Sequence, residues 1–305
     1  MRPRDDNRIR IESADFGLSL ECAVDQELEL NGQLDLVKAT IARLRAQNSK
    51  GFDVFLHSDA PPGSGLGSSS ALIVGLVGMV KEFKNLPLTE YEVAHLAYLI
   101  ERQDLKIQGG HQDQYASSFG GFNFIEFHAD RVIVNPLRIR QDTVNELEHN
   151  LLLCYTGTTR RSDRIIEDQT KRFEDGQEST LRALREQKQL ALDMKNALLR
   201  HKLEEFGDLL HSAWQAKKNL SPKISNPSID EMYETARRHG AIGGKITGAG
   251  GGGYMLLYCQ FERKHKVAEA LKKQGFLPTE FAFEPHGLQT WRIHENSVRD
   301  FAVGN

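Results

Sequence analysis

A segment with three alternating glycines and three consecutive serines lies directly before an apolar stretch in the first third of the chain. Residues 60–70 read Ala-Pro-Pro-Gly-Ser-Gly-Leu-Gly-Ser-Ser-Ser and are too rich in glycine and proline to form a helix or a strand. Residues 71–80 are apolar on every side of a helix, which is typical of a buried helix. The order predicts a glycine loop that opens a buried helix from about Ser68 to Phe83.

This first glycine loop is a candidate anion site. Glycine lets the backbone approach a ligand closely, and the free N–H groups of a helix's first turn carry partial positive charge. The alternative is that Ser68 only caps the helix while the prolines and glycines form the turn. Two common nucleotide motifs are excluded. No lysine follows Gly67, as a GxxxxGK[ST] loop requires, and the spacing of the glycines at 63, 65 and 67 does not fit GxGxxG.

The rest of the chain mixes strand and helix patterns, which predicts an α+β fold of two lobes. Strands are expected at residues 8–12, 18–22, 27–30, 52–56, 121–127, 131–134, 151–155, 255–259, 279–283 and 288–293. Helices are expected at residues 35–47, 90–104, 229–239 and 264–274, with two or three more between 163 and 220. We expect an N-terminal lobe over residues 1–155 and a C-terminal lobe over residues 156–305.

The composition limits the classes of partner and the location that we expect for the protein. The 39 basic and 42 acidic side chains give a net charge of -3, which argues against nucleic acid and against an anionic membrane surface. The longest apolar run, residues 71–80, is half the length that crosses a bilayer, and Met1 is not followed by an apolar leader, so we expect a soluble cytoplasmic protein. Three distant cysteines fit neither a disulfide framework nor a metal site and are expected to be buried in strands: Cys22, Cys154 and Cys259.

A second glycine-rich segment, Lys-Ile-Thr-Gly-Ala-Gly-Gly-Gly-Gly at residues 245–253, precedes the strand expected at 255–259. Together with residues 61–70, it resembles the phosphate-binding motif and the third motif of the GHMP kinases, small-molecule kinases that use ATP. Six further segments are similar to the heptose 7-phosphate kinases of that family: residues 12–17, 110–116, 119–123, 134–137, 155–157 and 225–227. The resemblance extends to about Ile293. It implies an N-terminal, ATP-binding lobe like domain 2 of ribosomal protein S5 and a ferredoxin-like, helical C-terminal lobe.

The resemblance also implies roles for residues of the N-terminal lobe. Asp113, in the expected loop 108–115, would be the catalytic base, although an aspartate after glycines is otherwise more often a helix cap. Glu101 and Ser69 would bind Mg²⁺, with Ser68 as the near alternative for the serine; a charged residue on a polar helix face is otherwise usually just solvated. ATP would be bound by Pro62, Gly63, Ser64, Gly65, Leu66, Gly67, Ser68, Ser69 and Ser70.

The implied acceptor is a sugar phosphate, whose dianion needs cationic partners. The implied reaction transfers phosphate from ATP to O1 of D-glycero-α-D-manno-heptose 7-phosphate. Three kinds of residue are expected to meet the sugar phosphate, each with an alternative: Arg160 and Arg161 could equally be surface residues, Lys245 could cap its strand, and His111 could be structural, as a lone histidine more often is. Residues expected near the sugar phosphate are His111, Thr156, Gly157, Arg160, Arg161, Lys245, Gly248, Ala249, Gly250 and Gly251.

One part of the family pattern has no counterpart in the sequence. Family members begin with an additional strand and a segment resembling R-x-x-x-x-G-G-G-T-D, and nothing similar precedes Arg8. The first hypothesis is therefore an active kinase whose missing part is encoded upstream or supplied by another chain. The second is a catalytically impaired, kinase-like binding protein, and the third is a fucose- or mevalonate-type GHMP kinase. A homodimer is compatible with each.

Overall fold

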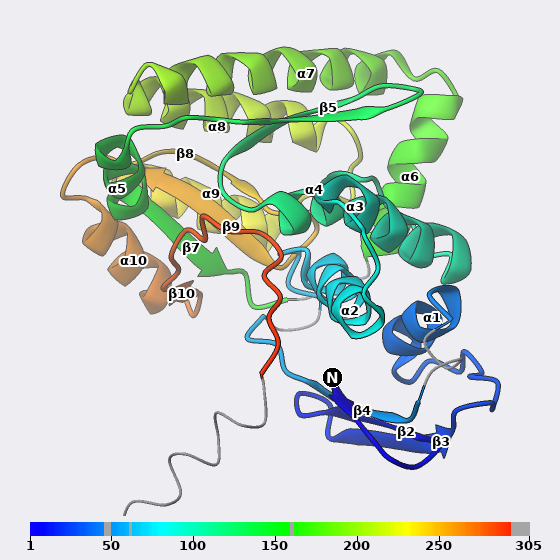
Figure 1. The fold of residues 1–305 in the computed structure, drawn as a ribbon. Helices are drawn as coiled ribbons and strands as arrows, with labels where there is room; N and C mark the ends of the chain where they lie inside the picture. Colours follow the sequence, from blue (N-terminus) through cyan, green and yellow to red (C-terminus); the bar gives the residue numbers. More distant parts are fainter. Residues whose placement is uncertain (46–49, 61–62, 159–161, 294–305) are drawn as a thin grey trace, which may run out of the picture.

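The chain folds into two lobes, each built around a four-stranded sheet (Figure 1). The structure is a computed structural model that describes residues 1–45, 50–60, 63–158 and 162–293. Both lobes combine a sheet with packed helices, and the α+β class predicted from the sequence is confirmed. The two glycine loops lie where the lobes meet.

The N-terminal sheet has the strand order β1–β4–β2–β3 and has a core on one face only. In β2, Ile9 and Ile11 are buried while Arg8 and Arg10 are exposed, the alternation of a half-buried strand. Strand β2 runs parallel to β4 and antiparallel to β3. The elements of this layer are β1 (Arg2–Pro3), β2 (Arg8–Ser13), β3 (Leu18–Ala23), α1 (Asp35–Arg43), β4 (Phe52–Leu56) and α2 (Ser68–Lys84).

Helix α2 is buried on two sides, as its all-round apolar sequence predicts. Leu76 and Val80 pack on the N-terminal sheet, whereas Ile73 and Val77 pack on the helices beyond it. Those helices are α3 (Glu90–Leu99), which begins with a capping box between Thr89 and Glu92, the π-helical turn η2 (Ile100–Asp104) and α4 (Gln112–Phe119). This packing fixes the amino ends of α2 and α4 beside each other.

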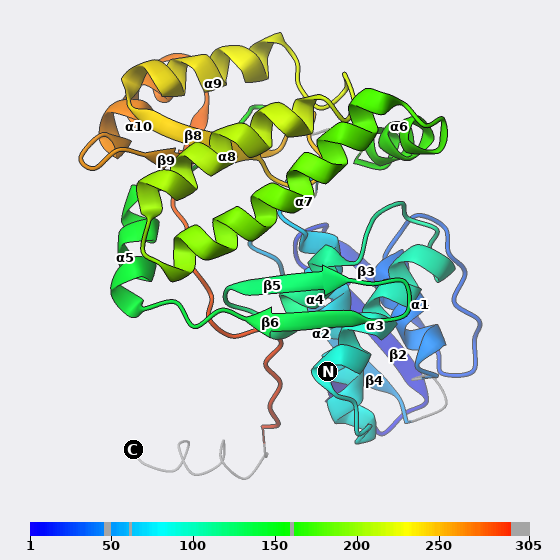
Figure 2. The ribbon, with the colours of Figure 1, turned by 90° about the horizontal axis from the view of Figure 1, so that it is seen from above.

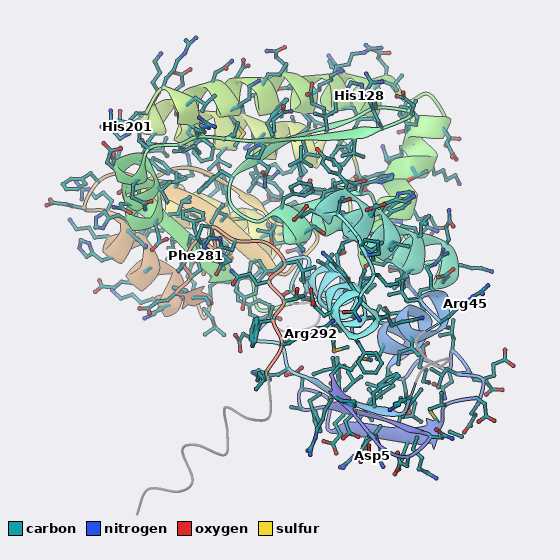
Figure 3. All side chains as sticks on the ribbon, viewed as in Figure 1. Asp5, Arg45, His128, His201, Phe281 and Arg292 are labelled. Atoms are coloured by element: carbon teal, nitrogen blue, oxygen red, sulfur yellow. The ribbon has the colours of Figure 1, made fainter. Side chains whose placement is uncertain are left out.

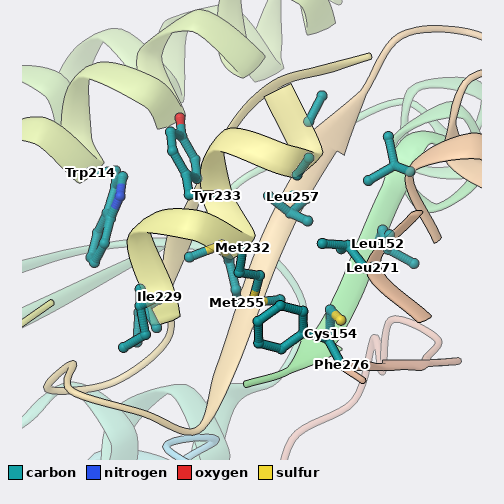
Figure 4. Close-up of a cluster of buried hydrophobic side chains, with 14 of the residues drawn as sticks. Leu152, Cys154, Trp214, Ile229, Met232, Tyr233, Met255, Leu257, Leu271 and Phe276 are labelled. Atoms are coloured by element: carbon teal, nitrogen blue, oxygen red, sulfur yellow. The ribbon is translucent and has the colours of Figure 1, made fainter. Parts of the chain in front are cut away.

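The C-terminal sheet, β10–β7–β9–β8, is antiparallel throughout and is covered on both faces. Its strands are β7 (Leu151–Tyr155), β8 (Ala241–Ile246), β9 (Tyr254–Cys259) and β10 (Leu277–Thr279). Met255 and Leu257 point into a core shared with α9 (Pro227–His239) and α10 (Lys264–Lys273) (Figure 4). Leu256 and Tyr258 point to the opposite face, where they meet helices α5 (Gln141–Asn150), α7 (Glu178–Leu199) and α8 (Leu203–Lys218).

Three helices occupy the stretch for which two or three were predicted: α6 (Ser162–Glu174), α7 and α8. Seen from above, the hairpin of β5 (Asn123–Phe127) and β6 (Val132–Pro136) lies beside α7 (Figure 2). The ammonium group of Lys195 on α7 lies 4.2 Å from the ring centroid of Phe124 on β5, a cation–π contact. The hairpin therefore links the helices of the two lobes.

Residues 280–293, called here the C-terminal strap, run in extended form from the C-terminal lobe to α2. Figure 3 shows Phe281 near the second sheet and Arg292 near the end of α2. Strands predicted at 279–283 and 288–293 are wrong, except that Thr279 ends β10, because the strap forms single bonds to helix ends and loops rather than a ladder. The amide of Leu288 bonds the carbonyl of Ser118, and the hydroxyl of Thr290 bonds Glu82.

Other differences from the predicted elements concern one strand each. Residues 27–30 form no strand, and the carbonyl of Glu29 accepts a bond from the Lys38 ammonium instead. Strand β8 escaped sequence analysis because Gly243 and Gly244 lie in its middle, and glycine is depleted in strands. The cysteines are buried in β3, β7 and β9, as predicted. Among the helices in the described ranges, none has both the length and the apolar character needed to cross a bilayer.

Candidate active site

The first glycine loop reaches α2 through a left-handed residue. Gly63, Gly65 and Gly67 have φ angles of 73°, 75° and 73°. Gly67 is the N-cap residue of α2 and makes no side-chain cap bond, so the alternative in which Ser68 caps the helix is wrong. The N–H groups of that turn have no intrahelical acceptors and are free for an anion. Along the loop, Leu66 is exposed and Ser64 is buried, whereas Pro62 lies outside the described residues.

The second glycine loop packs against the first through backbone atoms. A methyl group on Gly253 would lie 2.3 Å from the carbonyl oxygen of Ser64, and one on Gly248 would lie 2.9 Å from that of Gly65. In return, a methyl group on Gly65 would lie 3.2 Å from the carbonyl oxygen of Thr247. Side chains at these positions would separate the loops, so the two glycine-rich segments form one unit.

Asp113 lies in the first turn of α4, against the N-cap of α2. A methyl group on Gly67 would lie 3.3 Å from its carboxyl carbon. Burial raises the pKa of Asp113, the negative charge of Glu101 raises it further, and Arg102 opposes both. A carboxylate that binds a proton more readily than usual and lies beside an anion-binding loop is suited to general-base chemistry.

Glu101 lies below this turn and is only 1 % exposed. Its carboxylate accepts hydrogen bonds from the Ser69 hydroxyl at 2.8 Å, the Ser70 hydroxyl at 2.7 Å and the Gln114 amide at 2.5 Å. The interpretation of Glu101 as a solvated residue on a polar helix face is therefore wrong. The π-helical turn that carries it, closed by a bond from Leu105 N–H to the Ile100 carbonyl, is a feature common at functional sites.

The donor chemistry here fits Mg²⁺. Mg²⁺ is usually bound by one or two carboxylates and completes its octahedron with substrate phosphates and water. Glu101 and Ser69 offer a carboxylate and a hydroxyl oxygen side by side, and the bond between them favours Ser69 over Ser68 as the partner. Within the described ranges no group of three or more His, Cys, Asp or Glu side chains is arranged to hold a metal. Most ligands would therefore come from the nucleotide.

His111 precedes α4 and stacks on an aromatic side chain rather than bonding a protein group. Its ring lies 3.7 Å from that of Tyr98, and its buried Nδ1 has no hydrogen-bond partner within the described part of the chain. Burial lowers the pKa of His111, and the positive charges of His95 and Arg102 add to this. A neutral imidazole with an unused polar atom is available to a sugar hydroxyl.

The remaining predicted sugar-phosphate residues mostly support the second loop. Thr156 is buried, and its hydroxyl bonds the carbonyl of Gly253 at 3.0 Å. The amide of Gly251 bonds the carbonyl of Ile224, against which Gly250 also packs. Ala249 packs against the core of the C-terminal lobe, and a methyl group on Gly157 would meet nothing within 4 Å. Arg160 and Arg161 lie outside the described residues.

Two residues at the site were missed by sequence analysis, Gln114 and Lys217. Gln114 completes the hydrogen bonding of Glu101, and its place beside Asp113 was the available signal. Lys217, at the end of α8, donates a 2.6 Å bond to the carbonyl of Gly248 and lies near Lys245 of β8. Nothing in the helical sequence 203–218 marked Lys217, because helices rich in lysine are usually solvated.

Comparisons with known proteins identify the family of this chain. Residues 35–121 match the GHMP kinases N terminal domain, and residues 194–276 match the GHMP kinases C terminal model. A D-glycero-alpha-D-manno-heptose 7-phosphate kinase of Campylobacter jejuni is 40% identical over 294 residues, which is 95% of this chain and 86% of that protein. The chain belongs to the GHMP kinase family. This GHMP kinase is accordingly an ATP-dependent phosphotransferase.

Two further likenesses extend over most of this GHMP kinase. A solved structure described as a D-glycero-D-manno-heptose 1-phosphate kinase from Bacteroides thetaiotaomicron is 33% identical, with a TM-score of 0.76 and coverage of 96% of this chain and 86% of that one. The mevalonate kinase of Thermococcus sibiricus is 27% identical over 303 residues, which is 93% of this chain and 86% of that protein. The heptose kinases are thus nearer in sequence than this mevalonate kinase.

Proposed function

We propose that this GHMP kinase transfers the γ-phosphoryl group of ATP to O1 of D-glycero-α-D-manno-heptose 7-phosphate, giving ADP and the 1,7-bisphosphate. The observation that carries the proposal is the position of Asp113 against Gly67, directly beside the amino end of α2. The name of the 40% identical Campylobacter relative supports the acceptor. The Bacteroides relative shares the heptose in its name but not the position of its phosphate; a free C1 hydroxyl is what the proposed transfer requires.

The reaction assigns one proton transfer to the protein. The sugar O1 attacks Pγ, the bond from Pγ to the bridging oxygen of the β-phosphate breaks, and ADP leaves with the electron pair. Asp113 accepts the proton from O1, and its raised pKa favours this acceptance. Phosphoryl transfer otherwise depends on positioning and on neutralising charge.

The first glycine loop and α2 would hold the ATP phosphates. The amides of the first turn of α2 lie in this region, where the helix dipole favours negative charge, and the Ser68 and Ser69 hydroxyls belong to the same turn. Glu101 and Ser69 would hold Mg²⁺, which supplies charge neutralisation on the phosphates when bound. Ser70 and Gln114 orient the Glu101 carboxylate toward this task.

The acceptor would lie between α4 and the second loop. His111 offers its Nδ1 to a sugar hydroxyl, and Lys245 offers a positive charge. Thr156 and Gly251 bond neighbouring backbone, and Gly248 and Gly250 pack against it, which would shape the wall. Gly157, Arg160 and Arg161 remain predictions for the same wall.

A coupled assay of ADP release tests the proposal. The purified chain is assayed with ATP and Mg²⁺ against heptose 7-phosphate, L-fucose and mevalonate at matched concentrations. We expect turnover with heptose 7-phosphate and at least ~100-fold lower kcat/KM with the other two, because neither carries a phosphate to bind. A higher kcat/KM with fucose or mevalonate would make that compound the acceptor in place of heptose 7-phosphate. Turnover with none of the three, despite measurable ATP binding, would favour a kinase-like binding protein.

A further inference from the structure

Two lysines lie beside the second glycine loop on the side of the C-terminal lobe. Helix α8 packs closely along β8, since a methyl group on Gly243 would lie 2.0 Å from the carbonyl oxygen of Gly207. This packing brings Lys217, in the last turn of α8, and Lys245, near the end of β8, to the same place. The Lys217 ammonium bonds the carbonyl of Gly248 at 2.6 Å and is thereby directed at the loop.

Neither ammonium group is balanced by a carboxylate. Among the residues the structure describes, no Asp or Glu oxygen lies within 4.0 Å of the Nζ of either lysine. Burial lowers the pKa of both lysines, and the charge of Lys245 helps to lower that of Lys217 to about 7. Two like charges, partly removed from water and without a counter-ion, are unfavourable unless an anion binds between them.

The neighbouring lysine shows the contrast. Lys218 lies one residue further along α8, where its Nζ is 3.5 Å from a carboxylate oxygen of Asp230 and 5.6 Å from the ring centroid of Trp214. Its charge is therefore balanced within the protein. Within the described residues the lysine pair, unlike Lys218, has no such partner, which points to a ligand.

We propose that Lys217 and Lys245 bind the phosphate monoester of the acceptor sugar, at the end opposite to the hydroxyl that is phosphorylated. This rests on the proposed function, in which the sugar carries a phosphate at C7. The ATP phosphates have their own site at the amino end of α2.

Steady-state kinetics of Lys217→Met and Lys245→Met test the subsite. We expect each variant to raise KM for the sugar 7-phosphate by ~10- to 100-fold, the size of a lost charge-assisted hydrogen bond, with KM for ATP changed less than about twofold. Lys217→Arg should recover part of the loss because it keeps the charge. Lys218→Met is the matched control, since it removes the same charge from the same helix and should leave both KM values unchanged.

Other outcomes overturn the proposal. A rise in KM for ATP with KM for the sugar phosphate unchanged would assign the pair to the nucleotide, and an unchanged KM for both would make the lysines structural. An equal rise in KM for the sugar phosphate in Lys218→Met would mean that the loss of any positive charge from this part of α8 has the same effect.

A second measurement tests the phosphate subsite independently of the proposal that heptose 7-phosphate is the acceptor. Inorganic phosphate is titrated calorimetrically into the wild type and into the double methionine variant, with a non-hydrolysable ATP analogue saturating the nucleotide site. Binding that is lost in the double variant supports the subsite even if heptose 7-phosphate proves not to be the substrate. Equal phosphate binding by the two proteins contradicts the subsite whatever the substrate is.

Discussion

The two glycine-rich loops have similar compositions and opposite roles. The first ends at a helix, where the amides of the opening turn of α2 lack intrahelical acceptors. The second ends at a strand, and three of its amides are already used: Thr247 bonds Tyr254, Gly251 bonds Ile224 and Gly253 bonds Thr158. The first loop therefore presents donors to a ligand, whereas the second fixes the first loop to the C-terminal lobe. Glycine allows backbone-to-backbone packing where the two loops meet, and in the first loop it would also allow a ligand to approach the backbone.

This difference predicts which measured property each change should alter. Substitutions at the first loop and the adjoining α4 should reduce turnover more than stability. Substitutions at the contact surface of the second loop should reduce stability, and activity should fall as a consequence.

Asp113→Asn should have the largest effect on turnover. The amide cannot accept the proton of the acceptor hydroxyl, so kcat should fall by ~10²- to 10⁴-fold, the usual contribution of a general base. ATP affinity, measured by equilibrium binding, should be nearly unchanged because the phosphates are proposed to contact the first glycine loop and α2 rather than α4. The control is Asp130→Asn, an exposed aspartate whose carboxylate pairs with neighbouring Arg131. Wild-type turnover in Asp113→Asn would remove this residue from the mechanism.

Gly253→Ala should have the largest effect on stability. Its φ of +85° disfavours alanine, and the new methyl group would lie 2.3 Å from the backbone oxygen of Ser64, which cannot rotate away. Strain and overpacking together should lower the free energy of unfolding by about 2–4 kcal/mol, measured by urea titration.

Gly176→Ala separates the two causes of that loss. Gly176 has a φ of +66° and open space around it, so the strain alone should cost about 1 kcal/mol. Equal losses in Gly253→Ala and Gly176→Ala would show that the two loops do not depend on their close contact.

The sequence predicted those elements whose formation depends on the local sequence pattern. The glycine loop, the buried α2 and the strand at 151–155 follow from turn chemistry and apolar periodicity, and the structure has them at or near the expected residues. The strap at 280–293 could not be predicted, because its alternating pattern suits a strand and only tertiary contacts decide that no partner strand is present. The cause of β8 is likewise distant, since β9 and α8 stabilise a strand that contains two glycines.

The candidate site was predictable as a set of motifs but not as a set of contacts. Residues Ser69 and Glu101 were paired through family resemblance, and the 2.8 Å bond between them fits that pairing. The burial of Glu101 was not predictable, because the π-helical turn alters which face of the helix it occupies. Lys217 comes to the second loop through the packing of α8 on β8, a relation that no local pattern contains.

Gly67→Ala tests the contact between the first loop and the carboxylate of Asp113, the proposed base, and should have a smaller effect than the changes above. The methyl group would lie 3.3 Å from the carboxyl carbon of Asp113, so the side chain must shift by a few tenths of an ångström. We expect kcat to fall by about tenfold, because small displacements of a catalytic group are costly. Stability should fall by no more than in Gly176→Ala, since both substitutions introduce positive-φ strain. A stability loss as large as that of Gly253→Ala would erase the contrast between the loops.

The smallest effect concerns stability and pH at Asp113. Its pKa is raised in the folded protein by burial and then by Glu101, so folding favours the protonated form. The stability from that form is present at pH values below the ordinary pKa of aspartate and is lost as pH rises through the raised value. Asparagine, which never ionises, avoids this loss. In thermal unfolding at pH 7–8, Asp113→Asn should therefore melt slightly above the wild type, and the difference should close as pH is lowered toward the ordinary pKa, about 4. A lower midpoint for the variant at neutral pH would mean that the ionised carboxylate stabilises the fold, and the first loop would then share the structural role of the second.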